Sequence, residues 1–255
     1  MNQSVKKALG LLDLFTEDRP EITLKDIAEL SGIPKPTVYR LLTTLETCGF
    51  LYKIKDNEHD SRFRLGLKLL ELGQMVSNQL ELREISLPYM EQLAREINEV
   101  VHLVVIHQNK ATYIEKVDST RALRLYTRVG KSLPLYIGSG PKMLLAHLEK
   151  NQQKEILCDP SFKTFIQKQN RSVQDFHSEL DNIRRTGYAY SIGEQDADTT
   201  GISFPIHNHH GRVIAALAVS GLSSHFEGEN LEDLKRKTKL ITVKVSNQLG
   251  YQKEG

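Results

Sequence analysis

The chain has 255 residues, of which 39% are hydrophobic and 26% are charged, and its formal net charge at pH 7 is +2. This length accommodates two domains with separate cores, and the composition is typical of a soluble globular protein. No apolar run reaches the roughly twenty residues of a membrane span. Asp13 interrupts the apolar segment near the N-terminus and no cleavage site follows, which excludes a signal peptide. We therefore expect a cytoplasmic protein without membrane contact.

Sequence motifs of the common enzyme classes are absent. The chain has no GxSxG, P-loop, HExxH or complete dinucleotide motif, so we expect neither an enzyme nor a cofactor. Cys48 and Cys158 lie too far apart for a CxxC pair, and we interpret both as unpaired thiols. The HNHH run at 207–210 contains metal-ligand residue types, but Gly211 follows it. We favour a hairpin turn there and expect no metal site.

Residues 3–16 are predicted to form the first helix. Five apolar side chains recur there at helical spacing and make one stripe: Val5, Ala8, Leu9, Leu12 and Phe15. The stripe is expected to pack behind the helices that follow.

Residues 24–31 and the segment from Pro34 to about Glu46 are predicted to be two short helices joined by a tight turn. Thr23 is a natural N-cap, and Gly32 can adopt the left-handed conformation that a sharp turn requires. Four apolar residues share one side of the second helix: Val38, Leu41, Leu42 and Leu45. The pair is typical of a helix-turn-helix, although an ordinary helical hairpin has the same pattern.

The outer face of the second helix has the residue types that contact DNA. It carries cations, hydroxyl groups and an aromatic ring, and no carboxylate precedes Glu46. In a helix-turn-helix, such a helix meets base edges in the major groove, and its cations and hydroxyl groups meet phosphates. We expect specificity from Thr37, Val38, Tyr39 and Arg40, positioning from Lys35, and further contacts from Pro36 and Thr43.

A β-hairpin is predicted directly after these helices. Residues 50–54 and 61–65 are rich in β-forming side chains, and a polar stretch separates them. A hairpin in this position is a wing, whose cations contact the sugar-phosphate backbone or the minor groove. The candidate contacts are Lys53, Lys55, His59, Arg62 and Arg64. Basic and acidic residues are balanced over 1–80, so DNA affinity is expected to depend on local clustering and on salt.

Three segments carry a resemblance to a known family. In this order, SVKKALGLLDLF, LKDIAELSGIPKPTVYRLLTTLETCGFL and RFRLGLKLLELG resemble the isocitrate lyase regulator (IclR) family of bacterial transcription factors. The resemblance implies a winged helix-turn-helix at 1–65, a dimerising linker helix at 66–82, and an α+β effector-binding domain at 83–255 that is similar to GAF domains. It also implies double-stranded operator DNA as a partner and a homodimer or a dimer of dimers.

Residues 66–82 carry more apolar side chains than packing against a single domain would bury. The apolar residues of this helical pattern include Leu67, Leu70, Met75 and Leu80. We favour the dimerising linker, and the alternative is a core helix within one domain, because an apolar stripe does not identify its partner.

The rest of the chain predicts an α+β domain, because strands and helices intermix around one sheet. A helix is expected at 84–98, with Pro88 near its first turn. Strands are expected on both sides of a turn at 108–110, and at 123–129, 188–194, 202–208 and 212–222. Further helices are expected after an extended arm that begins at residue 131, at 175–186 and at 230–249.

Three polar stretches of this domain are candidates for one ligand site. Gly138, Ser139 and Gly140 precede a helix, whose free N–H groups would attract a carboxylate or a phosphate. A lone GSG is more often a plain turn. The other two stretches are the acidic loop at 191–201 and the strand end at Ser220. In the family these stretches line a pocket for a small organic molecule, often a carboxylic acid or an aromatic compound.

The resemblance assigns the site residue by residue. The expected effector-binding set is Gly138, Ser139, Gly140, Lys142, Ser191, Glu194, Asp196, Ser203 and Ser220. Ser191 stands where an acidic residue is frequent in the family, and Phe204 is expected to point inward and to reduce or reshape the cavity. The effector is therefore expected to differ from the small keto acids that some members bind.

The sequence thus predicts a DNA-binding transcriptional regulator, expected to be a repressor, whose operator binding is modulated by a small organic effector. Two alternatives remain. One is an activator with the same architecture, and the other is a protein-interaction or ligand-sensing module that does not bind DNA.

Overall fold

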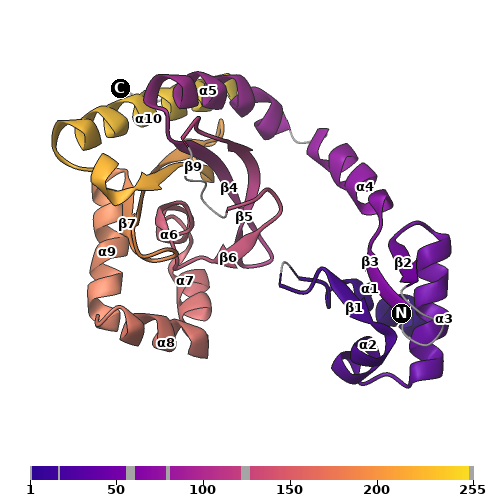
Figure 1. The fold of residues 1–255 in the computed structure, drawn as a ribbon. Coiled ribbons are helices and arrows are strands. Elements are labelled where there is room, and N and C mark those ends of the chain that lie inside the picture. The colour runs from indigo at the N-terminus through magenta and orange to yellow at the C-terminus, as the bar shows by residue number, and fades with distance from the viewer. Residues whose placement is uncertain (1, 17, 56–60, 79–80, 122–126, 253–255) are drawn as a thin grey trace. The chain divides into compact units, whose positions relative to one another are not determined.

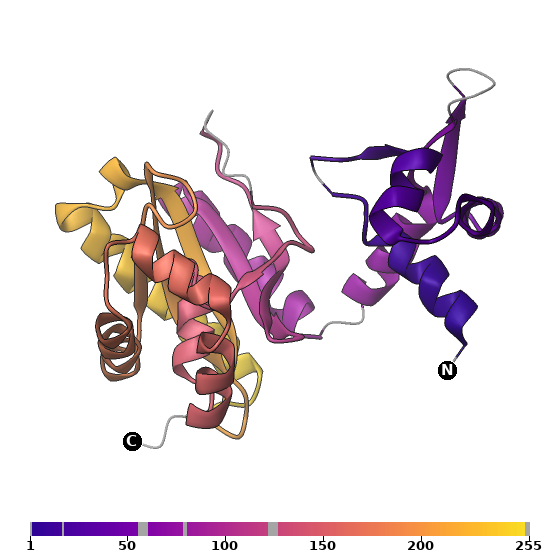
Figure 2. The same ribbon diagram turned by 90° about the horizontal axis from the view of Figure 1, so that it is seen from below.

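The computed structural model describes residues 2–16, 18–55, 61–78, 81–121 and 127–252. The chain divides into two compact units, Met1–Gln79 and Leu80–Gly255 (Figures 1 and 2). Each unit has its own hydrophobic core, as the length of the chain predicts. None of the described helices is both long enough and apolar enough to cross a lipid bilayer.

The first unit packs helices on a three-stranded antiparallel sheet. Its elements are α1 (Gln3–Leu12), β1 (Glu21–Thr23), α2 (Leu24–Ser31), α3 (Lys35–Thr47), β2 (Leu51–Lys55), β3 (Ser61–Leu65) and α4 (Leu67–Asn78). The strand order is β1-β3-β2, so β3 is the central strand. This arrangement is a winged helix-turn-helix, as the sequence predicts.

Local signals define the two helices of the helix-turn-helix. The side chain of Thr23 caps α2, and Gly32 ends it with a φ of 65°. The four apolar residues predicted for α3 are all buried, and Val38 and Leu42 are fully inaccessible. They pack with side chains of α2 and β3 in one core, which fixes the rotation of α3 about its axis.

Two details of this unit differ from the prediction. Helix α1 ends at Leu12 rather than at residue 16, and the residue that it buries is Leu11. Val5 and Leu9 are each 53% exposed, so their place in the predicted stripe is wrong. Strand β1 was not predicted, because three residues are too few to show an alternating pattern.

The second unit is a six-stranded antiparallel sheet with helices on both faces. Its strands are β4 (Val100–His107), β5 (Lys110–Val117), β6 (Ser132–Pro134), β7 (Ala189–Ile192), β8 (Thr199–His207) and β9 (Val213–Leu222). Its helices are α5 (Glu81–Ile97), α6 (Ser139–Ala146), α7 (Lys150–Leu157), α8 (Pro160–Lys168), α9 (Val173–Thr186), the 3-10 helix η1 (Ser223–His225) and α10 (Gly228–Gln248). The strand order is β6-β5-β4-β9-β8-β7.

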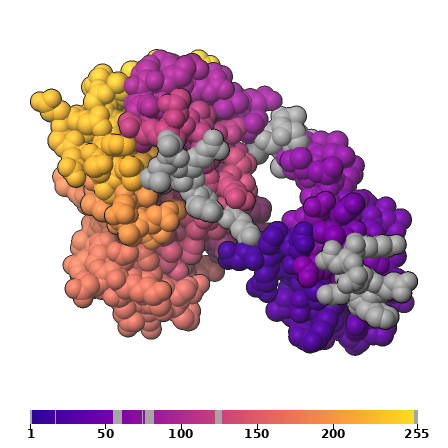
Figure 3. All heavy atoms as spheres, in the orientation of Figure 1, coloured from indigo at the N-terminus to yellow at the C-terminus, as the bar shows by residue number. Residues whose placement is uncertain are grey.

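Hydrophobic cores lie on both faces of this sheet. Helices α5 and α10 lie side by side on one face (Figures 1 and 3), and α6 packs on the other face with α9 beside it. Residues along β9 alternate between the two cores. Leu217 and Val219 belong to the core under α5 and α10, whereas Ala216 belongs to the core under α6.

Two expectations for this unit need correction. Helix α5 begins at Glu81, so Pro88 lies in its interior rather than near its first turn. Of the strand predicted at 123–129, residues 123–126 lie outside the described residues, and residues 127–129 are not in a strand. The third strand is β6, which pairs with β5. Helices α7 and α8 occupy a segment for which no helix boundaries were predicted.

Gly221, in β9, approaches a buried carboxylate. A Cβ atom on Gly221 would lie 2.2 Å from Glu99 Oε2 and 2.9 Å from Phe226 Cε2. We predict that Gly221→Ala lowers the free energy of unfolding of the second unit by about 1–3 kcal/mol, because it overpacks the core. Gly10→Ala in α1, where a Cβ meets open space, should instead stabilise the first unit by about 0.5–1 kcal/mol. Urea denaturation measures both, and an undiminished stability of Gly221→Ala would contradict the prediction.

Candidate nucleic-acid interface and ligand cavity

The exposed face of α3 is formed by Lys35, Pro36, Tyr39, Arg40 and Thr43. Their spacing places them along the side of the helix that is opposite the buried apolar residues. Tyr39 is 50% exposed, so its ring is open to a partner. Thr43 Oγ1 donates a hydrogen bond of 2.9 Å to the carbonyl of Tyr39, and its lone pairs remain available as acceptors. This face therefore presents cations, an aromatic ring and a hydroxyl group.

Some of the predicted DNA contacts lie elsewhere. Val38 is fully buried in the core of the first unit, so its assignment as a base contact is wrong. Thr37, next to it, is half-buried. The side chain of Lys55 and the whole of His59 lie outside the described residues.

The two arginines of the wing lie on the face of its sheet that is turned away from the core, whereas Lys53 is paired with the buried Phe63 and lies on the other face. Alternation along β3 turns Arg62 and Arg64 to the exposed face. The guanidinium of Arg64 lies 4.7 Å from the centre of the Tyr52 ring. Lys53 Nζ lies 5.9 Å from the centre of the Tyr39 ring, which connects the wing with the exposed face of α3.

A small polar cavity lies in the second unit, between the sheet, the start of α6 and the loop after β7. Its volume is about 30 Å³, close to the share of one molecule in liquid water. The lining residues are Tyr113, Thr127, Ser139, Gly140, Ser191, Glu194, Gln195, Asp196, Thr199, Thr200, Gly201, Ala218 and Ser220. The structure thus brings residues of all three predicted stretches together. Gly138, Lys142 and Ser203 are not part of the lining.

Three serine hydroxyl groups meet over Gly201 in β8. A Cβ atom on Gly201 would lie 2.9 Å from Ser139 Oγ, 3.1 Å from Ser191 Oγ and 3.3 Å from Ser220 Oγ. These serines come from α6, β7 and β9, and a glycine leaves the room in which they approach one another. Because a hydroxyl group both donates and accepts, this part of the wall can bind a polar atom without fixed charge.

The N-terminus of α6 is already engaged by side chains of the protein. The N–H of Gly138 donates to Glu194 Oε2 at 2.7 Å, and the N–H of Ser139 donates to Ser191 Oγ at 3.1 Å. The prediction that these two N–H groups are free for a ligand is therefore wrong. Gly140, in the first turn of α6, has no preceding helical carbonyl for its N–H, and it lines the cavity.

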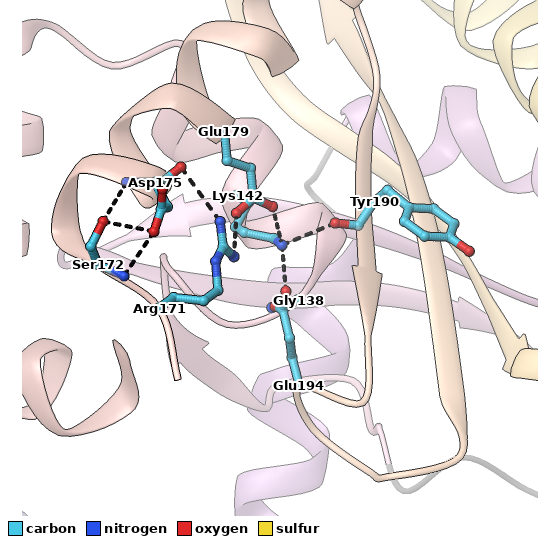
Figure 4. A network of polar contacts seen from close by, with 8 residues as sticks. All are labelled: Gly138, Lys142, Arg171, Ser172, Asp175, Glu179, Tyr190 and Glu194. Carbon is cyan, nitrogen blue, oxygen red and sulfur yellow. Dashed lines mark hydrogen bonds and ion pairs between the residues drawn. The ribbon is translucent and has the colours of Figure 1, made fainter. Parts of the chain in front are cut away.

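Lys142 in α6 is 1% exposed. It does not line the cavity, but it contacts Glu194, which does. Its ammonium group donates to Glu179 in α9, to Glu194 after β7 and to the carbonyl of Tyr190 (Figure 4). Arg171 donates to the second oxygen of Glu179 at 2.7 Å. One buried cation thus ties three elements together. Since Lys142 does not line the cavity, we assign it a positioning role rather than a ligand contact.

Ser203 and Phe204 point to opposite faces of β8. Ser203 shares the cavity face with Gly201, but it is fully buried. Phe204 belongs to the core under α5 and α10, where its ring stacks on Tyr188 with 5.9 Å between ring centres. The expectation that Phe204 reduces the cavity is therefore wrong.

Several lining residues are absent from the set predicted residue by residue. They are Tyr113, Thr127, Gln195, Thr199, Thr200, Gly201 and Ala218. Tyr113 and Thr127 lie outside the predicted stretches, whereas the other five lie within the loop at 191–201 or the strand end at 218–221. Most lie in strands or beside them, so their places in the wall depend on strand pairing. Gln195 Nε2 donates to the Tyr113 hydroxyl at 3.4 Å, which links the loop after β7 to β5. Strand register is the signal that would have identified Ala218, which is the cross-strand partner of both His102 and Ser203.

His102 in β4 lies directly beside the cavity wall. It is 1% exposed, and its ring centre is 5.3 Å from that of Tyr113 at an interplanar angle of 85°. Neither ring nitrogen has a hydrogen-bond partner in the described parts of the chain. Burial lowers the pKa of His102 to about 3, so its imidazole is neutral at physiological pH.

The HNHH segment lies at the turn between β8 and β9, where Gly211 has a φ of 72°. Over the residues that the structure describes, no three His, Cys, Asp or Glu side chains are grouped so that they could hold a metal ion. Cys48 and Cys158 are both exposed free thiols.

A winged helix-turn-helix in one unit and a polar cavity in the other define a ligand-responsive, DNA-binding regulator of transcription. Residues 4–54 match the IclR helix-turn-helix domain, and residues 74–247 match the bacterial transcriptional regulator IclR C-terminal domain. The chain therefore belongs to the IclR family of bacterial transcriptional regulators, which combine DNA binding with an effector-binding C-terminal domain and are not enzymes.

Individual relatives agree with this assignment. KipR, an HTH-type transcriptional regulator of Bacillus subtilis, is 32% identical over 250 residues, 98% of each protein. The acetate operon repressor of Salmonella typhimurium is 25% identical over 234 residues, 91% of this chain and 84% of the repressor. The structure of an IclR homolog from Microbacterium hydrocarbonoxydans complexed with 4-hydroxybenzoate has a TM-score of 0.80 and 26% identity, and the match covers 97% of this chain and 99% of the homolog.

The neutral state of His102 makes stability depend on pH. Its folded-state pKa of about 3 lies below the ordinary 6.5, so between these values the unfolded chain binds a proton that the folded protein does not. We therefore predict that the free energy of unfolding falls as the pH falls through this range. The contribution of His102 to this loss is up to about 1.4 kcal/mol per pH unit. Urea denaturation at a series of pH values should show a shallower loss for His102→Phe than for the wild type and for His209→Asn in the exposed turn. Equal slopes for all three proteins would contradict the prediction.

Proposed function

We propose that this protein is a cytoplasmic repressor that binds a pseudo-palindromic operator as a homodimer or a dimer of dimers, under the control of a small organic effector. The observation that carries the proposal is the exposed face of α3, where Lys35, Tyr39 and Arg40 stand together and no acidic residue of the helix precedes Glu46. The name of the Salmonella relative, a repressor, supports the direction of regulation.

The candidate DNA contacts of the first unit divide into two roles. Thr37, Tyr39 and Arg40 would contact base edges in the major groove, where a guanidinium can bind guanine through two hydrogen bonds. Contacts to the sugar-phosphate backbone are assigned to Lys35, Pro36, Thr43, Lys53, Lys55, Arg62 and Arg64. Val38 contributes from the core by holding α3 in place.

Helix α4 supports the proposed dimer. We divide the chain into a DNA-binding domain at 1–65, a linker at 66–82 and an effector-binding domain at 83–255. Helix α4 forms most of the linker. Leu67 is 77% exposed, Leu70 is 68% exposed and Met75 is 57% exposed. Because these apolar side chains are exposed on one helix, we expect a second copy of the same helix to bury them in the dimer. A twofold dimer would then present two α3 helices to two half-sites.

The effector is assigned to the cavity of the second unit. Its carboxylate would accept hydrogen bonds from the Gly140 N–H and the Ser139 hydroxyl at the positive end of α6. Ser191, Asp196 and Ser220 line the same cavity, while Gly138 and Lys142 hold Glu194 in its wall. The 4-hydroxybenzoate bound by the Microbacterium homolog supports a small organic acid. Such an effector regulates if it binds more tightly to one placement of the DNA-binding units than to another.

Arg40→Ala tests the proposed DNA interface. We predict that it weakens operator binding by about 1–3 kcal/mol, because a base contact is lost. Lys35→Ala should lower the affinity for all DNA sequences to a similar extent. It should also reduce the slope of log affinity against log salt concentration by about one, the value for one phosphate contact. The control is Lys25→Ala, whose exposed side chain lies on α2. The measurement is fluorescence anisotropy on an operator selected from genomic DNA with the purified protein.

The DNA-binding proposal fails in either of two cases. In the first, the wild type selects no DNA fragment at low salt, with or without small-molecule ligands. In the second, Arg40→Ala and Lys25→Ala bind the selected operator equally well.

Leu70→Glu tests the proposed dimer helix. We predict that sedimentation velocity shows dissociation to monomers, because the dimer contact would bury the unpaired charge of the glutamate. Operator affinity should fall as well, because a monomer binds only one half-site at a time. Leu240→Glu on α10 is the matched control, since Leu240 is 52% exposed but lies on another helix. A dimer that persists in Leu70→Glu would rule out α4 as the interface.

A further inference from the structure

Two fully buried polar side chains flank the floor of the effector cavity. Ala218 lines the cavity, and its cross-strand partners are His102 on β4 and Ser203 on β8. Cross-strand partners point to the same face of a sheet, with Cβ atoms about 4.5–5.5 Å apart. The imidazole and the hydroxyl group are therefore directly beside the methyl group that forms the floor.

Neither side chain has a hydrogen-bond partner among the described residues. Both ring nitrogens of His102 and Ser203 Oγ lack one, and the two residues are 1% and 0% exposed. Buried polar groups are rarely left unpaired, because they lose their hydrogen bonds to water without replacement. Two such groups on either side of one cavity-lining residue indicate a missing polar partner.

The chemistry of the pair restricts that partner. The neutral imidazole can donate from one nitrogen and accept at the other, and a serine hydroxyl group can do both. Neither group has a charge, so neither would compensate an ionised atom at the floor. Gly140 lies above Ala218, since a Cβ on Gly140 would be 3.4 Å from Ala218 Cβ. The floor is therefore in contact with α6, and one small molecule that binds the α6 N-terminus at one end and the floor at the other requires α6 to move away from the sheet.

We propose that His102 and Ser203 are specificity-determining residues that bind an uncharged hydroxyl oxygen at the inner end of the effector. The effector class is then a small hydroxy acid, with its carboxylate at Gly140 and Ser139. This inference rests on the proposed function, because it assigns a chemical class to the same cavity.

Ser86 provides the matched control. It is also 0% exposed with an unpartnered hydroxyl group, but it lies in α5, on the opposite face of the sheet from the cavity. Ser86→Ala and Ser203→Ala therefore remove the same group from equally buried sites. If both hydroxyl groups were only defects of packing, the two substitutions would have the same effect on ligand binding.

The test is calorimetric titration of the full chain with two matched pairs of probes, 4-hydroxybenzoate against benzoate and lactate against propionate. We expect the wild type and Ser86→Ala to bind at least one hydroxy acid at least about tenfold more tightly than its partner without the hydroxyl group. Ser203→Ala should lose most of this ratio. His102→Phe should lose it too, while it retains an aromatic ring against Tyr113. Thermal unfolding of each variant confirms that it is folded.

Three results would overturn the inference. They are equal binding of both members of each pair by the wild type, an unchanged ratio in folded Ser203→Ala and His102→Phe, and no binding of either hydroxy acid. Operator binding is measured separately on the same proteins. A wild type that binds operator but not the hydroxy acids refutes the effector class alone, whereas a wild type that binds no DNA refutes the proposed function.

Discussion

The buried ammonium group of Lys142 is the interaction on which the second unit depends most. A lysine that is 1% exposed is tolerated only because two carboxylates and a carbonyl oxygen surround it. Those partners belong to α9, to β7 and to the loop that follows β7, so charge compensation also fixes the arrangement of these elements around α6. Glu194 then uses its other oxygen to accept from the Gly138 N–H, which places the carboxylate in the cavity wall.

In the first unit the corresponding constraint is apolar. The burial of Val38 and its neighbours along α3 sets the rotation of the helix, and Tyr39 and Arg40 point outward as a consequence. Lys53 of the wing lies over the Tyr39 ring, so the core and the wing restrict the same recognition face. Specificity therefore depends on buried residues that never touch DNA as well as on exposed ones.

Sequence reasoning was strongest where the signal is local. The Thr23 cap, the left-handed Gly32 and the apolar spacing of α3 each depend on a few adjacent residues, and the structure confirms them. It failed where the outcome depends on a partner distant in sequence. Phe204 was assigned to the wrong face because alternation gives two faces without saying which one meets α6, and the role of His102 appears only when β4, β5 and β9 are paired.

The close contact of Gly140 with the sheet affects how fast the cavity can change. A Cβ on Gly140 would be 3.1 Å from Val104 Cγ2, so at this point the helix backbone itself lies against the sheet. Rotamer changes of lining side chains take picoseconds to nanoseconds, but they do not widen a gap that backbone defines. Room for a molecule larger than water requires displacement of α6, and collective movements of packed helices take microseconds to milliseconds. The rate of effector binding is therefore expected to be limited by helix displacement rather than by diffusion.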